Sequence, residues 1–302
     1  MSKKTIALVG GTGRLGILIA NALLEKADVQ VRLLVRAGSR SKVAELEKRG
    51  AHIVGGSLGP EDGAALAALC NGAFAVVSAV QGGPDVIVEG QRRLLRAVRD
   101  AGVRRFFPSD YSLDLFKVKP GNITTSEMRR QFALIEESER GNVEVVHVLN
   151  GAFLDRGVLG FIRVIDVEKQ TACVWGDGKQ PMDWTTYEDT ARYTAEAAVD
   201  DQPLPRKFSV AGNVVDFAHL VQEYEAGSGK KLKVERLGSI EDLSTRIAEL
   251  QKANPQNLFA YLPLMYLRSM LTGEGKLDAL MNDRYPSIRP TTVREYVAKE
   301  GL

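Results

Sequence analysis

The segment GGTGRLG, residues 10–16, constrains the fold of this chain more than any other stretch. It follows the short apolar run TIALV and opens RLGILIANALLEKA, whose apolar residues recur on one helical face. Glycines between a strand and a helix allow a tight turn, let backbone amides approach a phosphate, and let the helix pack on the sheet. Gly10, Gly13 and Gly16 therefore predict a strand–turn–helix unit that holds a dinucleotide pyrophosphate, with a purely structural turn as the alternative.

Strand and helix patterns go on alternating to about Asn150. The expected strands are TIALV, VRLLV, AHIV, AFAVVSAV, RRFFP and VEVVHVL, with amphipathic runs between them. This rhythm predicts an α/β fold with a doubly wound parallel sheet, a Rossmann domain over residues 1–152. KFSVAG, near residues 207–212, is expected to return to that sheet.

Residues 153–302 are expected to form a smaller, mostly helical C-terminal domain for a substrate or partner. QTACVWGDGKQPMDW has the pattern of a hairpin, and KLKVERL that of a strand. NLFAYLPLMYLRSML is either a core helix or an apolar partner surface.

Composition narrows the functional classes. The 40 basic and 38 acidic residues nearly balance, which does not favour a nucleic-acid-binding protein. Cys70 and Cys173 are too few and too far apart for a disulfide framework or a zinc cluster, and they fit a reducing cytoplasm. No apolar run approaches the roughly 18 residues of a membrane span. We expect a cytoplasmic protein with no metal site.

Cations follow the second expected strand. Arg36 stands about 20 residues after Gly16, where NAD-binding proteins usually place an acid for the ribose 2′-hydroxyl. Arg40 and Lys42 follow, with no acid between residues 35 and 42. Cations suit a 2′-phosphate, so the sequence predicts NADP(H) over NAD(H), with a solvated basic loop as the alternative.

The usual proton-transfer residues of short-chain dehydrogenases are missing. None of the eight tyrosines is followed by lysine at the fourth position, so the Tyr-x-x-x-Lys pair is absent. His147, within VEVVHVL, is interpreted as a core residue.

Several motifs together resemble the NmrA-like and isoflavone reductase-like branch of the atypical short-chain dehydrogenases. They are GGTGRLG, LLVR, VRRFFPSDYS, VLNGAFLD, WGDGKQPMDWTTYEDTARYTAEA and NDRYPSIRPTTVREYV. The resemblance implies a Rossmann domain that binds NADP(H), with the nicotinamide in a cleft against a small second domain. It assigns the pyrophosphate to Gly10, Thr12, Gly13, Arg14, Leu15 and Gly16, the 2′-phosphate to Arg36, the ribose to Ala79, Val80 and Gln81, and the nicotinamide surroundings to Pro108, Ser109, Asp110, Tyr111, Asn150, Gly151 and Phe153.

This chain departs from the plant reductases of that branch, which use a helix lysine as general acid or base. Met128 stands at the matching position, with Arg129 and Arg130 beside it. Arginine stays protonated near neutral pH, so it orients a carbonyl or carboxylate but is a poor proton donor. Lys117 and Lys119, on a loop, are further candidates for the proton transfer. Tyr111 is the first candidate for a substitute acid, with packing under the cofactor as its alternative role.

Two functions follow from these observations. The first is an NADPH-dependent reductase of a small aromatic or quinone-like molecule, in a pocket between the domains. Its candidate substrate-binding residues are Tyr111, Arg129, Arg130, Phe153, Trp175, Met182 and Trp184, of which the aromatic residues serve equally well as core. The second is a non-catalytic, redox-sensing regulator of the NmrA type, which binds NADP(H) and a protein partner. Use of the nucleotide as a scaffold for non-redox chemistry is a third reading.

Overall fold

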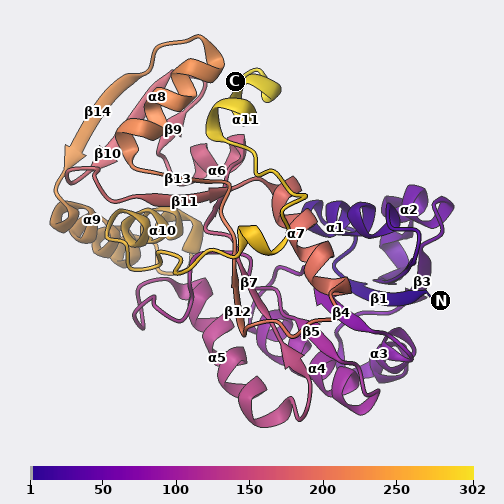
Figure 1. The fold of residues 1–302 in the computed structure, drawn as a ribbon. Helices are drawn as coiled ribbons and strands as arrows, with labels where there is room; N and C mark the ends of the chain where they lie inside the picture. Colours follow the sequence, from indigo (N-terminus) through magenta and orange to yellow (C-terminus); the bar gives the residue numbers. More distant parts are fainter. Residues whose placement is uncertain (1–2) are drawn as a thin grey trace.

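A six-stranded parallel sheet organises the first half of the chain in the computed structural model, which describes residues 3–302 (Figure 1). Its order is β3-β2-β1-β4-β5-β6, so the direction of strand addition reverses between β1 and β4. The strands are β1 (Lys4–Val9), β2 (Val29–Val35), β3 (His52–Gly55), β4 (Ala75–Ser78), β5 (Arg105–Phe107) and β6 (Glu144–Val145). The predicted doubly wound fold is confirmed, and sheets of this kind bind ligands at the carboxyl ends of strands beside the reversal.

Helices cover both faces of this sheet (Figure 1). One face carries α1 (Arg14–Leu24), α2 (Ala44–Lys48) and α7 (Tyr187–Val199), and the other carries α3 (Gly63–Cys70), α4 (Gln91–Asp100) and α5 (Thr124–Glu139). Alternate side chains of β1 serve the two faces, because Ile6 and Leu8 pack with α1 whereas Ala7 and Val9 pack with α3 and α4. A π-helical turn, Asp85–Gly90, leads into α4.

The chain returns to this sheet region after residue 152. β7 (His147–Leu149) pairs in parallel with β12 (Lys207–Ser209) in a two-stranded sheet, and the return of residues 207–212 to the six-stranded sheet stays a prediction. α7 also packs along α1. The boundary after residue 152 stays a prediction, since α7 and β12 lie beyond it and pack with the first unit.

The remaining elements enclose a second apolar core that includes Trp184, Tyr224 and Met265. Its strands are β8 (Ala152–Phe153), β9 (Ile165–Asp166), β10 (Thr171–Trp175), β11 (Met182–Thr185), β13 (Asn213–Val215) and β14 (Lys233–Gly238). Its helices are α6 (Arg156–Phe161), α8 (Phe217–Ser228), α9 (Ile240–Ala253), α10 (Leu262–Leu271) and α11 (Val293–Glu300). Most residues of α10 are buried, and its apolar side chains pack in this core. Most of NLFAYLPLMYLRSML is therefore core. Within residues 3–302, no helix is long and apolar enough to cross a bilayer.

The prediction of a hairpin over QTACVWGDGKQPMDW is wrong. β10 pairs with β14 and β9, whereas β11 pairs with β13 and β8. The Gly176 amide donates to Gly238 O at 2.8 Å, and the Phe217 amide donates to Gly178 O at 3.0 Å. These bonds join the segment between β10 and β11 to β14 and to α8, so this segment is not the turn of a β-hairpin.

Candidate functional site

The glycine turn joins β1 to α1 at the reversal point of the sheet. Gly10 has a φ of +88°, and the Gly13 amide donates to Gly10 O at 3.0 Å. A Cβ on Gly10 would lie 2.3 Å from Ala79 O, and a Cβ on Gly16 would lie 2.1 Å from Gly10 O. Within residues 3–302, a Cβ on Gly13 would have Gly10 O as its one neighbour closer than 4 Å, at 3.5 Å. Two glycines therefore serve close backbone packing, and the third leaves space for a ligand.

The first turn of α1 presents free amides at this space. Gly13 precedes the helix in an extended conformation, and no side chain caps it. The first intrahelical bond runs from the Ile17 amide to Gly13 O, so the amides of Arg14, Leu15 and Gly16 have no intrahelical acceptor. The turn carries no acidic side chain. A helix N-terminus of this kind attracts an anion.

A cavity of about 480 Å³ opens beside the turn, along the carboxyl ends of the first four strands. We call it the glycine-turn groove. Seven of the predicted site residues line it, namely Gly10, Thr12, Gly13, Arg36, Ala79, Val80 and Gln81. Val9, Leu34, Gly56, Ser57, Leu58, Gly59, Pro60, Asp85, Val86 and Arg93 complete the lining and were missed. The glycines after β3 were the available signal, since every strand of such a sheet ends at this edge.

The cations near β2 occupy different positions. Arg36 is exposed on the groove, and its guanidinium has no hydrogen bond or ion pair within residues 3–302. Arg40 forms an ion pair with Glu47, with Nη2 and Oε1 2.6 Å apart, and it does not line the groove. Lys42 is exposed and does not line the groove either. Arg93 reaches the groove from α4, with Nε donating to Leu58 O at 2.7 Å. Arg36 is thus the predicted cation that is free to meet an anionic ligand in the groove.

The end of β5 adjoins the groove wall. Ser109 Oγ donates to Val80 O at 2.7 Å, and the Ser109 amide donates to Gln91 Oε1 at 2.8 Å. Pro108, Ser109 and Asp110 are all buried here. The structure therefore brings these predicted residues beside the groove, although they do not line it.

The end of β7 lies next to the loop that follows β5. The amides of Asn150 and Gly151 both donate to Ser112 O at 3.1 Å. Gly151 has a φ of +66°, and a Cβ there would lie 2.4 Å from Asp183 O in β11. Gly151 is thus required by the close approach of the second unit. The ligand contacts predicted for Asn150 and Gly151 stay predictions.

Arg14 and Phe153 meet through a residue that the sequence did not single out. Arg14 pairs with Asp155 at 2.5 Å, and its guanidinium lies 4.3 Å from the ring centre of Tyr187. The ring of Phe153 stacks on the same Tyr187 side chain, with centres 3.9 Å apart and planes 4° apart. This stack joins the glycine turn to the second unit. Arg14 therefore faces the second unit, and its predicted pyrophosphate contact stays a prediction.

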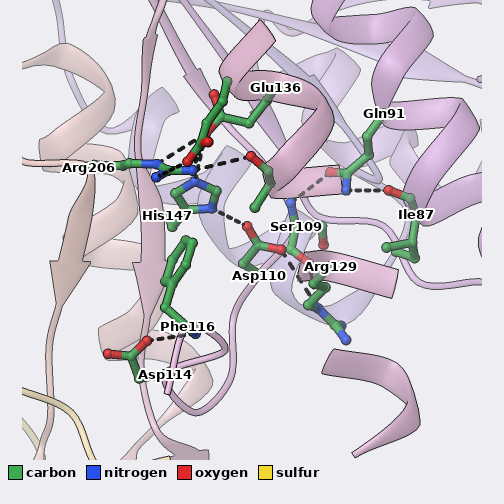
Figure 2. A network of polar contacts seen from close by, with 12 residues as sticks. Ile87, Gln91, Ser109, Asp110, Asp114, Phe116, Arg129, Glu136, His147 and Arg206 are labelled. Atoms are coloured by element: carbon green, nitrogen blue, oxygen red, sulfur yellow. Dashed lines mark hydrogen bonds and ion pairs between the residues drawn. The ribbon is translucent and has the colours of Figure 1, made fainter. Parts of the chain in front are cut away.

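Two predicted substrate residues, Arg129 and Arg130, lie on α5. Arg129 Nε donates to Ser109 O at 3.0 Å, and this side chain keeps 13% of its surface exposed (Figure 2). Arg130 instead turns to the preceding loop and donates to the carbonyls of Leu115 and Val118. Met128 is half-buried. Of the two arginines, Arg129 is the one placed beside the strand ends.

Four further candidates are packed as core or lie apart from the groove. Tyr111 is buried among core residues, and burial raises the pKa of its phenol well above the ordinary value. This placement does not favour Tyr111 as a proton donor. Met182 and Trp184 are fully buried in the second core. Trp175 ends β10, which lies on the side of the second unit away from α1 (Figure 1).

Fold and site together define a doubly wound α/β protein with a glycine-turn groove at the reversal of its sheet. Residues 2–297 match the NmrA-like family, so the chain belongs to that family.

Known relatives cover almost the whole chain. A bifunctional pinoresinol-lariciresinol reductase from Forsythia intermedia is 25% identical, with 99% of each chain covered. An isoflavone reductase homolog from Zea mays is 26% identical, with 98% of this chain and 97% of the relative covered. Both relatives are named as reductases, which supports the enzyme class predicted from the motifs.

Solved structures share the fold. A pinoresinol reductase, AtPrR2, solved with NADP+ and (+)pinoresinol, superposes with a TM-score of 0.81 at 21% identity and complete coverage of both chains. A leucoanthocyanidin reductase from Vitis vinifera, solved with NADPH, gives a TM-score of 0.81 at 17% identity, with 98% of each chain covered. The resemblance stated from the motifs is confirmed.

Proposed function

We propose that this chain is an NADP(H)-dependent reductase of a small aromatic molecule that carries an enone, quinone or other electrophilic carbon. One observation carries the proposal. The glycine-turn groove holds an open space over Gly13 and, within residues 3–302, an unpaired cation, Arg36. Behind its wall, Val80 is bonded to Ser109, and Ser109 is bonded to Arg129. Reductase relatives over the full chain length support it.

The groove residues fit a dinucleotide phosphate. The free amides of Arg14, Leu15 and Gly16 suit a pyrophosphate, and the space over Gly13 allows its close approach. Arg36 would hold the 2′-phosphate. NADPH, when bound, supplies a hydride, while the protein supplies orientation and electrostatics.

Replacing Arg36 with alanine is expected to weaken NADPH binding at least about 30-fold, because a charge-assisted phosphate contact contributes roughly 2 kcal/mol or more. NADH, which lacks the 2′-phosphate, should lose less than about twofold. Arg40→Ala is the matched control, since Arg40 already pairs with Glu47 outside the groove lining and should change neither affinity by more than about twofold. Calorimetric titration measures all four values. Equal losses of NADPH and NADH in the Arg36 variant contradict this role.

Arg129 is proposed to orient the substrate. Its guanidinium donates to Ser109 O and to Thr125 O, both at 3.0 Å, so it is fixed beside the strand ends. A fixed cation there stabilises negative charge on a carbonyl oxygen as the neighbouring carbon accepts a hydride.

Arg129→Met is expected to lower kcat/KM about 100-fold, the usual effect of removing one donor to a developing oxyanion. The Kd for NADPH should stay within about twofold. Gln131→Ala, at an exposed position of the same helix, is the control. Steady-state kinetics and calorimetry measure both quantities, and an unchanged kcat/KM in the methionine variant excludes the proposed role.

The function itself is tested by following NADPH absorbance with a panel of aromatic enones, quinones and lignan-type benzylic ethers. Turnover of at least one class is expected, together with reduced product. Tight NADPH binding with no oxidation across the panel would instead favour the redox-sensing regulator, for which α5 offers one argument, since it carries Met128 and no lysine at that position.

A further inference from the structure

β14 is an edge strand with one open side. It belongs to a three-stranded sheet of order β14-β10-β9, and among residues 3–302 no strand pairs with it on the side away from β10. Figure 1 shows β14 along the outer rim of the second unit, away from α1. Most of its residues are exposed. The strand therefore offers its free side to another strand.

The backbone groups on the open side belong to Val234 and Arg236. β14 runs parallel to β10, and the Lys233 amide donates to Gln170 O at 2.9 Å. Successive residues of a strand turn their backbone groups to opposite sides, so Lys233 and Glu235 turn theirs toward β10. The N–H and C=O groups of Val234 and Arg236 point outward, where a further strand would meet them.

The side chains of β14 differ between its two faces. Lys233 and Glu235 share the outer face, where Nζ and Oε1 are 2.7 Å apart. Val234 lies on the other face, paired with Ala172 of the second core, yet 50% of its surface is exposed. The strand thus presents an unlike pair of charges on one face and an uncovered apolar side chain on the other.

A second copy of β14 fits this edge in one register. Two edge strands related by a two-fold axis run antiparallel, and opposed side chains share a face, so the axis passes through a residue. An axis at Lys233, Glu235 or Arg236 would oppose two like charges. An axis at Leu237 would set the start of α9 in each copy against the strand. An axis at Val234 opposes the two valines and, on both sides of them, sets Lys233 against Glu235 of the second copy.

This register also uses the outward backbone groups. The two Val234 residues exchange N–H···O=C bonds across the axis, and the Arg236 amide meets Leu232 O of the second copy. The Leu232 amide is already bound by Glu225 Oε1 at 2.9 Å. A carboxylate is therefore present where Arg236 of the second copy arrives, and unlike charges meet there as well.

We propose that the chain forms a two-fold dimer through β14, with the Val234 residues opposed and Lys233 paired with Glu235 of the second copy. Charged side chains commonly protect edge strands from pairing. Here they carry both signs in an order that favours one self-pairing register, so they promote this contact. The glycine-turn groove, beside α1, stays open in both copies (Figure 1). This inference does not depend on the proposed reductase function.

Charge reversal tests the register. We expect the wild type to dimerise with a Kd of about 10–100 μM, because one strand pair makes a small interface. Lys233→Glu turns both unlike pairs into like pairs and should raise this Kd at least about tenfold. Combining it with Glu235→Lys restores unlike pairs and should return the Kd to within about threefold of the wild type. Lys48→Glu, at a similarly exposed lysine of α2, is the matched control and should leave the Kd unchanged.

Analytical ultracentrifugation measures these constants. A wild type that stays monomeric at about 1 mM overturns the proposal. A Lys233→Glu protein that dimerises as tightly as the wild type overturns it too, because the dimer then uses another surface. A double variant no tighter than Lys233→Glu contradicts the register.

Disulfide cross-linking locates the axis independently. Opposed residues of a hydrogen-bonded antiparallel pair have Cα atoms about 5.5 Å apart, within reach of a disulfide. We expect oxidised Val234→Cys to run as a covalent dimer on a non-reducing gel, and Leu237→Cys, set against Lys231 of the second copy, to stay monomeric. The wild type, with Cys70 buried and Cys173 half-buried, gives the background. No cross-link at Val234→Cys, or an equal one at Leu237→Cys, overturns the proposed pairing.

Discussion

Replacing Gly16 with alanine is expected to disrupt folding, whereas replacing Gly13 with alanine is expected to leave the fold intact and remove dinucleotide binding. Both glycines belong to the same turn, and both would gain one methyl group. The difference lies in what that methyl group would meet. This pair therefore separates the structural from the ligand-binding reason for a glycine.

At Gly16 the added Cβ would lie 2.1 Å from Gly10 O and 2.9 Å from Gly11 Cα. Both atoms are backbone, so neither can move without opening the turn between β1 and α1. Overpacking of this kind costs about 3 kcal/mol or more. We expect the Gly16→Ala protein to be insoluble, or to melt roughly 6–12 °C below the wild type.

At Gly13 the backbone is extended, with φ −91° and ψ 163°, which alanine adopts without strain. Its Cβ would project into the groove at the N-terminus of α1, where the pyrophosphate is proposed to lie. We expect a Tm within about 2 °C of the wild type and a Kd for NADPH raised at least about 100-fold, or 2.7 kcal/mol. Calorimetric titration and thermal unfolding measure the two effects. A Gly13→Ala protein that binds NADPH normally contradicts the proposed position of the dinucleotide.

Replacing Arg105 with methionine is expected to destabilise the protein by about 3–5 kcal/mol, because three carbonyls lose a charged donor and each such loss costs about 1–3 kcal/mol. The Arg105 side chain is fully buried. Its guanidinium donates to the carbonyls of Ala197, Asp200 and Gln202 at 2.7–2.8 Å, and it also pairs with Glu144. It thus caps the C-terminal end of α7 and ties that helix to β5. Methionine would leave three carbonyls without this donor.

The neighbouring residue offers a matched control. Arg104 is 36% exposed and lies 3.6 Å from the same carboxylate of Glu144. Arg104→Met should cost less than about 1 kcal/mol, as is usual for exposed ion pairs. Urea unfolding of both variants compares the costs. Similar losses in the two would mean that the carbonyl contacts of Arg105 contribute little to stability.

Local pattern was sufficient for the first sheet and its glycine turn. Each strand there has a clear apolar run, each helix a single apolar face, and the connections are short. The same reasoning failed at β10 and β11, because strand partners depend on distant segments. β10 pairs with β14, which follows two intervening helices in the sequence. Nothing within residues 170–185 indicates that partner.

Side-chain direction limited the prediction of the site. Tyr111 stands a few residues after β5, as the predicted site residues do, but its ring packs into the core. Sequence position does not tell on which side of a strand end a side chain turns. Arg93 was missed for a related reason, since it reaches the groove from the first turn of α4 and not from a strand end.

His147 was interpreted from the sequence as an ordinary core residue, and it is fully buried as expected. Its partners, Asp110 and Glu136, come from the loop after β5 and from the fourth turn of α5. Their convergence is a property of the tertiary structure, and no spacing in the sequence indicates it. The two carboxylate contacts of His147 are therefore visible only in the fold.

The central claim is that the glycine-turn groove binds NADP(H) for hydride transfer. Calorimetric titration with NADPH, NADP+, NADH and NAD+ in one buffer tests it most directly. We predict that NADPH binds at least as tightly as NADP+, and that both bind at least about 30-fold more tightly than the forms without the 2′-phosphate. Equal affinity for NADH and NADPH would contradict the role of Arg36, and much tighter binding of the oxidised forms would contradict the reductase in favour of a redox-sensing regulator.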